Sequence, residues 1–279
     1  MKLRFKHQKF QEDATNAICN VFSGQPNETR KFLLDQGSSS SAAQSLFTDT
    51  QTGWANPQIH LREEDILKNL REVQKTNKIL PSNKIETLTS KVEWDDGRKQ
   101  TVVKPVFTVE METGTGKTYT YIKTMYEMNA RYGWSKFIIV VPSIAIREGV
   151  AKSFQITADH FKEEYGKACR YFIYNSTRLN ELEQFADDPG INVMIINTQA
   201  FNATGKDARR IYMKLDSFRS RRPIDVISSV NPIVIVDEPQ SVIGVTGGKN
   251  VTRDSLGKFN PLFYINYSAT HRENFNMVY

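Results

Sequence analysis

The chain has 279 residues, of which 39% are apolar and 24% charged, a balance typical of a water-soluble globular protein. No apolar run approaches the ~18 residues of a membrane-spanning helix, and residues 1–6 lack a signal-peptide core. We therefore expect a cytoplasmic protein without a membrane partner. Cys19 and Cys169 are too few and too far apart for a disulfide framework or a zinc site, and the net charge of +6 permits a polyanionic partner.

Residues 1–24 are predicted to carry an amphipathic helix over residues 9–22, ended by Gly24. Phe10 and Gln11 lie just inside its start. A side-chain amide offers both a donor and an acceptor, which suits the edge of adenine, and an aromatic ring can stack on the base. A solvated or capping glutamine is the alternative interpretation.

Residues 25–104 are predicted to form an elaboration ahead of the next motif. Residues 36–58 are polar and small, which predicts a flexible loop. Residues 63–78 have the apolar spacing of a helix. A hairpin is expected next, with strands over residues 87–94 and 99–103.

The strongest motif is residues 111–118, which read METGTGKT between an apolar strand at 106–109 and a helical segment at 119–130. Glycines let such a loop curl so that its N–H groups face an anion, and the helix N-terminus adds positive potential. The lysine can reach the β- and γ-phosphates of ATP, and the threonine hydroxyl can ligate Mg²⁺. The predicted nucleotide contacts are Thr113, Gly114, Thr115, Gly116, Lys117 and Thr118. Met111 stands where the strict pattern has glycine, and a Gly-rich turn with a solvated lysine is the alternative.

The rest of the chain, residues 105–279, alternates between strands and helices. Apolar β-branched runs are expected to be strands at residues 136–141, 170–174, 193–196, 233–236 and 262–267, with a helix at 144–161. This pattern predicts a mostly parallel sheet covered by helices on both faces. Active sites of such sheets lie at the carboxyl ends of the strands.

Polar side chains follow two of these strands. Asp237 and Glu238 end a buried run, where the first would hold Mg²⁺ and the second would position or deprotonate the attacking water. A solvated acidic turn is the alternative. Ser268 and Thr270 follow the last strand, where they can hydrogen-bond the acidic pair and couple it to the γ-phosphate.

Together these motifs resemble those of superfamily-2 helicases, and more closely those of the restriction (Res) subunit of type III restriction-modification enzymes. In that family the phosphate loop typically reads METGTGKT, and an Asp-Glu-Pro-Gln, here at residues 237–240, is followed by Ser-Ala-Thr-His, here at 268–271. The resemblance implies a RecA-like P-loop domain, with the predicted helix and hairpin inserted ahead of the loop. It also implies ATP hydrolysis coupled to movement on double-stranded DNA, endonuclease activity of the full-length protein, and a methyltransferase (specificity) subunit as partner.

The same resemblance predicts DNA contacts. It places Pro142, Ser143, Thr198 and Gln199 where such motors grip the DNA backbone, although ordinary strand-to-helix turns are the alternative. Residues 206–222 also hold seven cations against two carboxylates. Their charge could track DNA phosphates, with Arg219, Arg221 and Arg222 as the candidates. A solvated helix face explains the block equally well.

The sequence stops nine residues after Thr270, so we expect this chain to be the first motor lobe of a larger protein. The second lobe and the nuclease domain would then lie outside it, and the lobe alone would bind ATP with little hydrolysis. The alternatives are the motor lobe of a type I restriction or repair helicase, and a nucleotide-dependent DNA clamp with little turnover.

Overall fold

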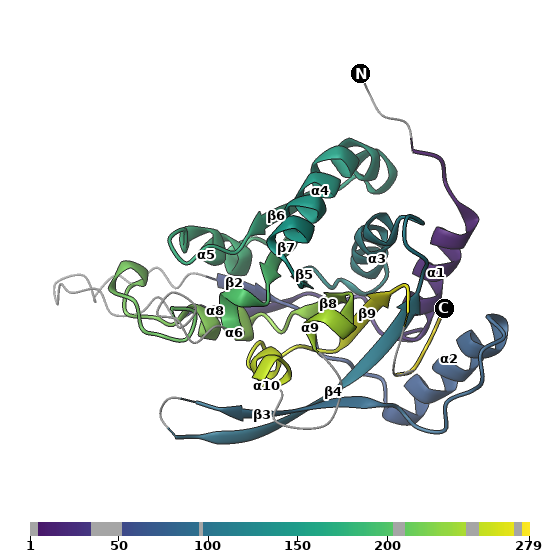
Figure 1. The fold of residues 1–279 in the computed structure, drawn as a ribbon, viewed down its shortest axis with the longest axis horizontal. Helices are drawn as coiled ribbons and strands as arrows, with labels where there is room; N and C mark the ends of the chain where they lie inside the picture. Colours follow the sequence, from purple (N-terminus) through teal and green to yellow (C-terminus); the bar gives the residue numbers. More distant parts are fainter. Residues whose placement is uncertain (1–4, 35–51, 95–96, 203–209, 244–250, 271–274) are drawn as a thin grey trace.

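The computed structural model describes residues 5–34, 52–94, 97–202, 210–243, 251–270 and 275–279. A seven-stranded sheet runs through the middle of the molecule, with helices on both of its faces (Figure 1). The α/β fold predicted from the sequence is therefore confirmed. Within the described ranges, no helix is both long and apolar enough to cross a bilayer.

The sheet is parallel except at one edge. Its order is β3 (Thr87–Glu93), β4 (Lys99–Glu110), β9 (Tyr264–Ser268), β8 (Ile233–Asp237), β5 (Lys136–Val141), β7 (Ile191–Asn197) and β6 (Cys169–Ile173). Only β3 pairs antiparallel, with β4. The carboxyl ends of β4, β9 and β8, which carry the phosphate loop and the two polar motifs, therefore meet at one edge of the sheet.

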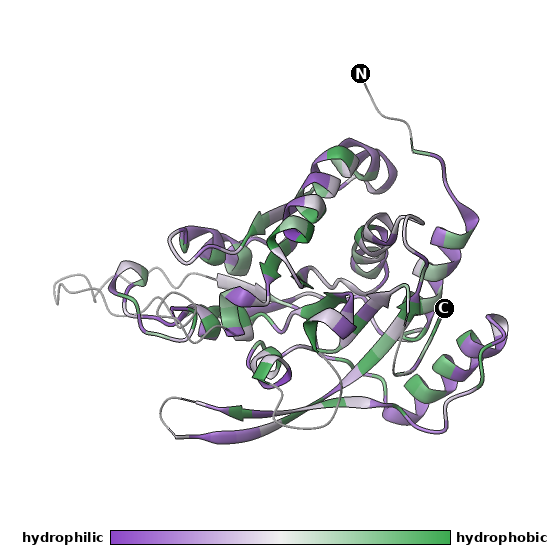
Figure 2. Ribbon diagram, in the orientation of Figure 1, coloured by the Kyte–Doolittle hydropathy of each residue, from purple (hydrophilic) through white to green (hydrophobic). Residues whose placement is uncertain are grey.

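The helices divide between two apolar cores. The first core lies under α1 (Lys9–Asn20), α2 (Glu63–Thr76), α3 (Lys117–Tyr132) and α4 (Ile144–Tyr165). The second lies under α5 (Asn180–Asp187), α6 (Gln199–Asn202), η1 (Asp216–Phe218), α8 (Pro223–Ser229), α9 (Pro239–Val242) and α10 (Val251–Gly257). Successive strand residues point to opposite faces, so Ile139 of β5 packs in the first core and Ile138 in the second. Figure 2 shows the central strands of the sheet as apolar, whereas the β3–β4 hairpin and the outer helix surfaces carry many hydrophilic residues.

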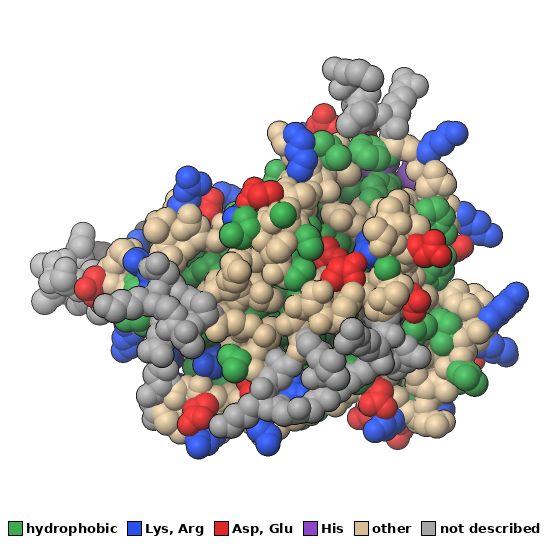
Figure 3. Space-filling model, viewed as in Figure 1, with side chains coloured by type: hydrophobic (Ala, Val, Ile, Leu, Met, Phe, Trp, Pro, Cys, Tyr) green, Lys and Arg blue, Asp and Glu red, His purple; other side chains and the backbone are tan. Residues whose placement is uncertain are grey.

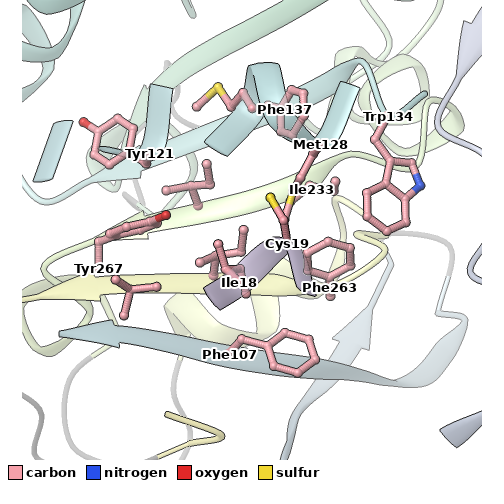
Figure 4. Close-up of a cluster of buried hydrophobic side chains, with 14 of the residues drawn as sticks. Ile18, Cys19, Phe107, Tyr121, Met128, Trp134, Phe137, Ile233, Phe263 and Tyr267 are labelled. Atoms are coloured by element: carbon pink, nitrogen blue, oxygen red, sulfur yellow. The ribbon is translucent and has the colours of Figure 1, made fainter. Parts of the chain in front are cut away.

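An aromatic cluster fixes the end of α1 against the sheet. The ring centre of Phe22 lies 4.4 Å from that of Phe263, 5.0 Å from that of Trp134 and 5.4 Å from that of Phe107. Figure 4 shows Phe107, Trp134 and Phe263 of this group. All four side chains are fully buried, and each contributes roughly 1.5–3 kcal/mol by leaving water. This packing holds α1 beside α3, so the start of α1 lies against the phosphate loop.

Part of the predicted 36–58 loop is a strand, and the prediction was wrong there. β2 (Thr52–Ala55) pairs antiparallel with β1 (Arg30–Leu33), and the Lys31 ammonium lies 4.7 Å from the centre of the Trp54 ring. The part of the predicted loop before residue 52 lies outside the described residues. The sequence of residues 52–55 did not indicate a strand, because β2 depends on pairing with a distant segment, β1.

The buried side chain of Asn56 connects the end of β2 to the main sheet. It donates to the carbonyls of Lys136 (2.8 Å) and Asn231 (3.0 Å), and it accepts from the N–H groups of Ser135 (2.7 Å) and Lys136 (2.9 Å). One amide thus hydrogen-bonds four backbone groups at the amino ends of β5 and β8.

The hairpin and its following strand form one continuous element. The two strands predicted at 99–103 and 106–109 are a single strand, β4, which passes through Pro105. Pairing with β3 ends at Pro105, and pairing with β9 begins at Val106. Because the proline lacks an N–H, it fits at the point where the strand changes partners. The predicted domain boundary at residue 104 falls inside this strand.

Candidate nucleotide-binding site

The phosphate loop joins β4 to α3, as the sequence predicts. Met111, where the strict motif has glycine, is 4% exposed and packs in the first core, and its N–H donates to the carbonyl of Ser268 at 2.9 Å. Gly114 and Gly116 have φ values of +83° and +87°, in the region that favours glycine. The loop keeps its glycines where the backbone needs them, and it uses Met111 as an apolar anchor.

Gln11 reaches this loop from α1. Its Nε2 donates to the carbonyl of Thr115 at 2.9 Å, and a Cβ added at Gly116 would lie 2.5 Å from the same nitrogen. The Gln11 side chain is buried, whereas neighbouring Phe10 is 38% exposed. The structure therefore links Gln11 to the loop backbone and leaves the ring of Phe10 open to a ligand. The role of Gln11 in reading adenine stays a prediction.

The acidic pair lies at the end of β8, facing the loop. Nζ of Lys117 lies 2.8 Å from Oε1 of Glu238, and both side chains are largely buried. Glu238 has φ +55°, a conformation that costs a residue with a Cβ about 1–2 kcal/mol. That strain turns the chain sharply from β8 into α9, which begins at Pro239. Figure 3 shows acidic and basic side chains meeting between α3 and α9.

The pKa values of the two carboxyls are shifted in opposite directions. Burial, together with the charge of Glu238, raises the pKa of Asp237 to about 6, although Lys117 and Tyr121 act against this. Burial also acts to raise the pKa of Glu238, but hydrogen bonds from Lys117, Gln240 and Ser268 outweigh it and lower that pKa. Glu238 is thus held as a carboxylate, while Asp237 gains its charge only near neutral pH or beside a cation.

A tyrosine that the sequence analysis missed supports Asp237. The Tyr121 hydroxyl, on α3, donates to Oδ2 of Asp237 at 3.4 Å. Burial and the charge of Asp237 raise the pKa of this phenol well above its usual range, and a hydrogen bond with Thr118 acts in the opposite direction. Figure 4 shows Tyr121 beside Tyr267, with ring centres 5.5 Å apart. The only sequence signal was its position four residues after Lys117, one helical turn along α3.

Ser268 connects the last strand to the acidic pair. Its hydroxyl lies 3.0 Å from Oε2 of Glu238, 3.0 Å from Oε1 of Gln240 and 2.8 Å from the carbonyl of Thr270. Gln240 also donates to Oε2 of Glu238 at 2.6 Å. The structure thus brings Ser268 to Glu238, and it adds Gln240, whose side-chain role the sequence analysis had not identified. Thr270 contacts Ser268 through its backbone.

The residues predicted to grip DNA follow β5 and β7, and they lie side by side. The N–H of Thr198 donates to the carbonyl of Val141 at 3.2 Å, and its hydroxyl lies 3.5 Å from the carbonyl of Pro142. Ser143 caps α4 by accepting from the N–H of Ile146 at 3.3 Å. Gln199 lines an adjacent hollow of about 620 Å³. Their contact with DNA stays a prediction.

The basic block is only partly exposed. Arg219 is exposed, whereas Arg221 is 6% exposed, pairs with Glu183 and has its guanidinium 4.3 Å from the centre of the Phe218 ring. The expectation that Arg221 binds a DNA phosphate is therefore not supported by its position. Nε of Arg222 pairs with Asp225 at 2.7 Å. The cations at positions 206 and 209 lie outside the described residues.

The donor set fits a nucleotide with Mg²⁺. Curled backbone at Gly114 and Gly116, the start of α3 and the ammonium of Lys117 together suit phosphate oxygens. The hydroxyl of Thr118 and the buried carboxyl of Asp237 are the hard oxygen ligands that Mg²⁺ prefers. Burial raises the pKa of Asp237, and a cation bound beside this carboxyl would stabilise its ionised form.

Comparisons with known proteins agree on one family. The family model described as "Type III restriction enzyme, res subunit" matches residues 59–273. The EcoP15I Res subunit of Escherichia coli is 30% identical over 243 residues, which cover 81% of this chain and 23% of that protein. The EcoPI Res subunit of Escherichia phage P1 is 30% identical over 242 residues, covering 80% and 23%. The chain therefore spans about a quarter of the length of these relatives.

A solved structure gives a more distant likeness. The Sulfolobus solfataricus SWI2/SNF2 ATPase core in complex with dsDNA matches with a TM-score of 0.39 and 12% identity. The match covers 79% of this chain and 34% of that one.

Proposed function

The chain belongs to the family of type III restriction enzyme Res subunits, and from that premise we propose that it is an ATP-binding motor lobe. The observation that carries the proposal is the meeting of Lys117 and Glu238 at 2.8 Å, from the phosphate loop and the end of β8. Two motifs separated by more than a hundred residues thus form one site. The bound nucleotide supplies the γ-phosphoryl group, and Mg²⁺ supplies positive charge for its transfer.

Each residue of the site has a distinct role in this proposal. Lys117 would exchange its contact with Glu238 for phosphate oxygens, and the loop N–H groups would bind the same oxygens. Thr118 and Asp237 would hold the metal, and Tyr121 orients the carboxyl of Asp237. Glu238, whose pKa is lowered, accepts the proton of the attacking water or positions that water. Ser268 and Gln240 keep Glu238 in place.

Movement on double-stranded DNA, endonuclease activity and a methyltransferase partner belong to the full-length protein, and we propose them by membership of the family. Pro142, Ser143, Thr198 and Gln199 would contact the DNA backbone. We also propose that a cation from another domain reaches the γ-phosphate from the side opposite Lys117. Such a cation increases the rate of hydrolysis by about 10³–10⁵-fold. This chain alone would therefore bind ATP with little hydrolysis.

Calorimetric titration with ATP and Mg²⁺ tests the site. The Lys117→Ala variant should lose binding by at least about tenfold, because an ammonium–phosphate contact is a charge-assisted hydrogen bond. Lys68→Ala, which removes an exposed lysine of α2, is the matched control and should bind as wild type does. Equal affinities for wild type and Lys117→Ala would refute the proposal.

A further inference from the structure

Residues 275–279, which we call the edge segment, lie along the strand that leads into the phosphate loop. Pairing between β3 and β4 ends at Pro105, and from Val106 onward β4 has β9 on one side. The edge segment lies on the other side, with a parallel bridge between Thr108 and Met277. Figure 1 shows this end of the chain between the tip of β4 and α2. The last part of β4 is thus held from both sides.

Backbone hydrogen bonds join the edge segment to β4 as far as the start of the phosphate loop. The N–H of Thr108 donates to the carbonyl of Asn276 at 3.3 Å, and the carbonyl of Thr108 accepts from the N–H of Val278 at 2.9 Å. The N–H of Glu110 donates to the carbonyl of Tyr279 at 2.7 Å. The residue after Glu110 is the first of the phosphate loop, so the segment reaches the point where the loop begins.

The side chain of Asn276 fastens the edge segment at its other end. This side chain is 1% exposed. It donates to the carbonyls of Glu86 (2.9 Å) and Val106 (2.7 Å), and it accepts from the N–H of Glu86 at 3.0 Å. The backbone of Asn276 has φ +43°, a conformation that asparagine tolerates better than most residues. One amide therefore joins the edge segment to β4 and to the residues that precede β3.

Two further amides reach the edge segment from α2 and the residue after it. The buried Gln74 donates from Nε2 to the carbonyl of Met277 at 3.0 Å and to Oγ of Ser82 at 2.8 Å. Nδ2 of Asn77 donates to the carbonyl of Val278 at 2.6 Å. With the two carbonyls that accept from β4, all four carbonyls of residues 276–279 have a donor. The predicted elaboration ahead of the phosphate loop thus supplies the side chains that hold this segment.

These contacts fix the start of the phosphate loop. The loop begins at Met111, whose N–H donates to the carbonyl of Ser268. The residue before it, Glu110, pairs with β9 on one side and bonds to the edge segment on the other. A phosphate loop binds its ligand through N–H groups that already face one place. If these groups had to be ordered on binding, the affinity would fall, so the hold on Glu110 bears on nucleotide binding.

We propose that the edge segment positions the phosphate loop for the nucleotide, with Asn276 as its main positioning residue. The inference rests on the proposed function as an ATP-binding lobe, and it adds residues that act through β4 rather than on the nucleotide. Without the Asn276 amide, the segment separates from β4 in a fraction of the molecules, and the start of the loop moves. The apparent affinity for ATP then falls with the fraction of molecules that remain competent to bind.

The test compares two buried amides in the 279-residue chain. Asn276→Gly removes the amide and keeps the left-handed backbone, and it should weaken ATP binding in Mg²⁺ by about three- to tenfold, measured by calorimetry. Asn56→Ala is the matched control, because it removes an equally buried amide with four backbone hydrogen bonds at the opposite, amino ends of the strands. Asn56→Ala should bind ATP as wild type does. Thermal unfolding checks that each variant is folded at the assay temperature.

Amide hydrogen exchange without ATP gives a second readout. In Asn276→Gly the amides of Thr108 and Glu110 should exchange faster relative to those of β5, because the edge segment no longer protects them. In Asn56→Ala this ratio should stay at the wild-type value. A purely structural role for Asn276 would leave the ratio unchanged.

Equal ATP affinity of wild type and folded Asn276→Gly overturns the inference and leaves the proposed function intact. Equal weakening in Asn276→Gly and Asn56→Ala also overturns it, because the loss then follows stability and not position. Wild-type chain that does not bind ATP refutes the proposed function, and the inference with it. If Asn276→Gly does not fold, Asn77→Ala removes a single bond to the segment and should weaken ATP binding about twofold; wild-type affinity in that variant overturns the inference.

Discussion

Replacing Asp237 by asparagine should stabilise the fold while removing a proposed ligand of Mg²⁺. Asp237 is 6% exposed, and its pKa is raised to about 6 from the usual 3.8. The folded protein therefore binds this proton more tightly than the unfolded chain does, and ionising the carboxyl at neutral pH destabilises the fold. The difference between the two pKa values corresponds to about 3 kcal/mol of destabilisation, at about 1.36 kcal/mol per pKa unit. Asparagine removes the charge and still accepts a hydrogen bond from Tyr121.

We expect Asp237→Asn to raise the free energy of unfolding by about 1–3 kcal/mol at pH 7.5 without nucleotide or Mg²⁺. In a chain of this size that raises the melting temperature by roughly 3–10 °C. The gain should shrink as the pH falls from about 6 to about 4, because wild-type Asp237 then takes up its proton. Thermal unfolding at several pH values measures this, with Asp159→Asn on the exposed face of α4 as the control. An Asp237→Asn variant that melts at or below the wild-type temperature at pH 7.5 would refute the reasoning.

Two further substitutions test other parts of the molecule. Glu238→Gln in the full-length enzyme should retain ATP binding by calorimetry yet lose about 10²–10⁴-fold in steady-state hydrolysis; unchanged hydrolysis would assign the water to another residue. Asn56→Ala should lower the free energy of unfolding, measured with denaturant, by about 2–4 kcal/mol, because it removes hydrogen bonds to four backbone groups. Asn83→Ala, in the loop before β3, is the control. An equal loss in both variants would argue against a specific docking role for Asn56.

The sheet could be predicted because its signal is local. The strand at residues 136–141 was predicted with the bounds of β5, since an unbroken apolar run is the signature of a strand buried on both faces. The candidate site residues on the loop and at the end of β8 could be proposed from the sequence for a related reason. Their chemistry requires particular residue types at fixed positions beside a strand, and those positions can be recognised in the sequence alone.

What could not be predicted depends on contacts between distant segments. Tyr121 looks like any helix residue until the structure places its hydroxyl against Asp237. Arg221 looks like part of a basic surface, but its guanidinium is buried against Phe218 and paired with Glu183. Nothing within residues 52–55 indicates β2, because its partner and its anchor on the sheet come from elsewhere in the chain. The helix predicted over residues 144–161 continues to Tyr165, where Gly166 with φ +66° ends it.

The Asn56 contact has a consequence for the order in which the chain folds. Its amide joins groups 79, 80 and 175 residues away along the sequence, and these groups come into position only when β5 and β8 already lie side by side. The segment around β2 can therefore dock only after the centre of the sheet has assembled. We expect Asn56→Ala to speed unfolding and to change the refolding rate little, as for contacts that form after the rate-limiting step. Docking of this segment would then mark the completion of the sheet rather than its nucleation.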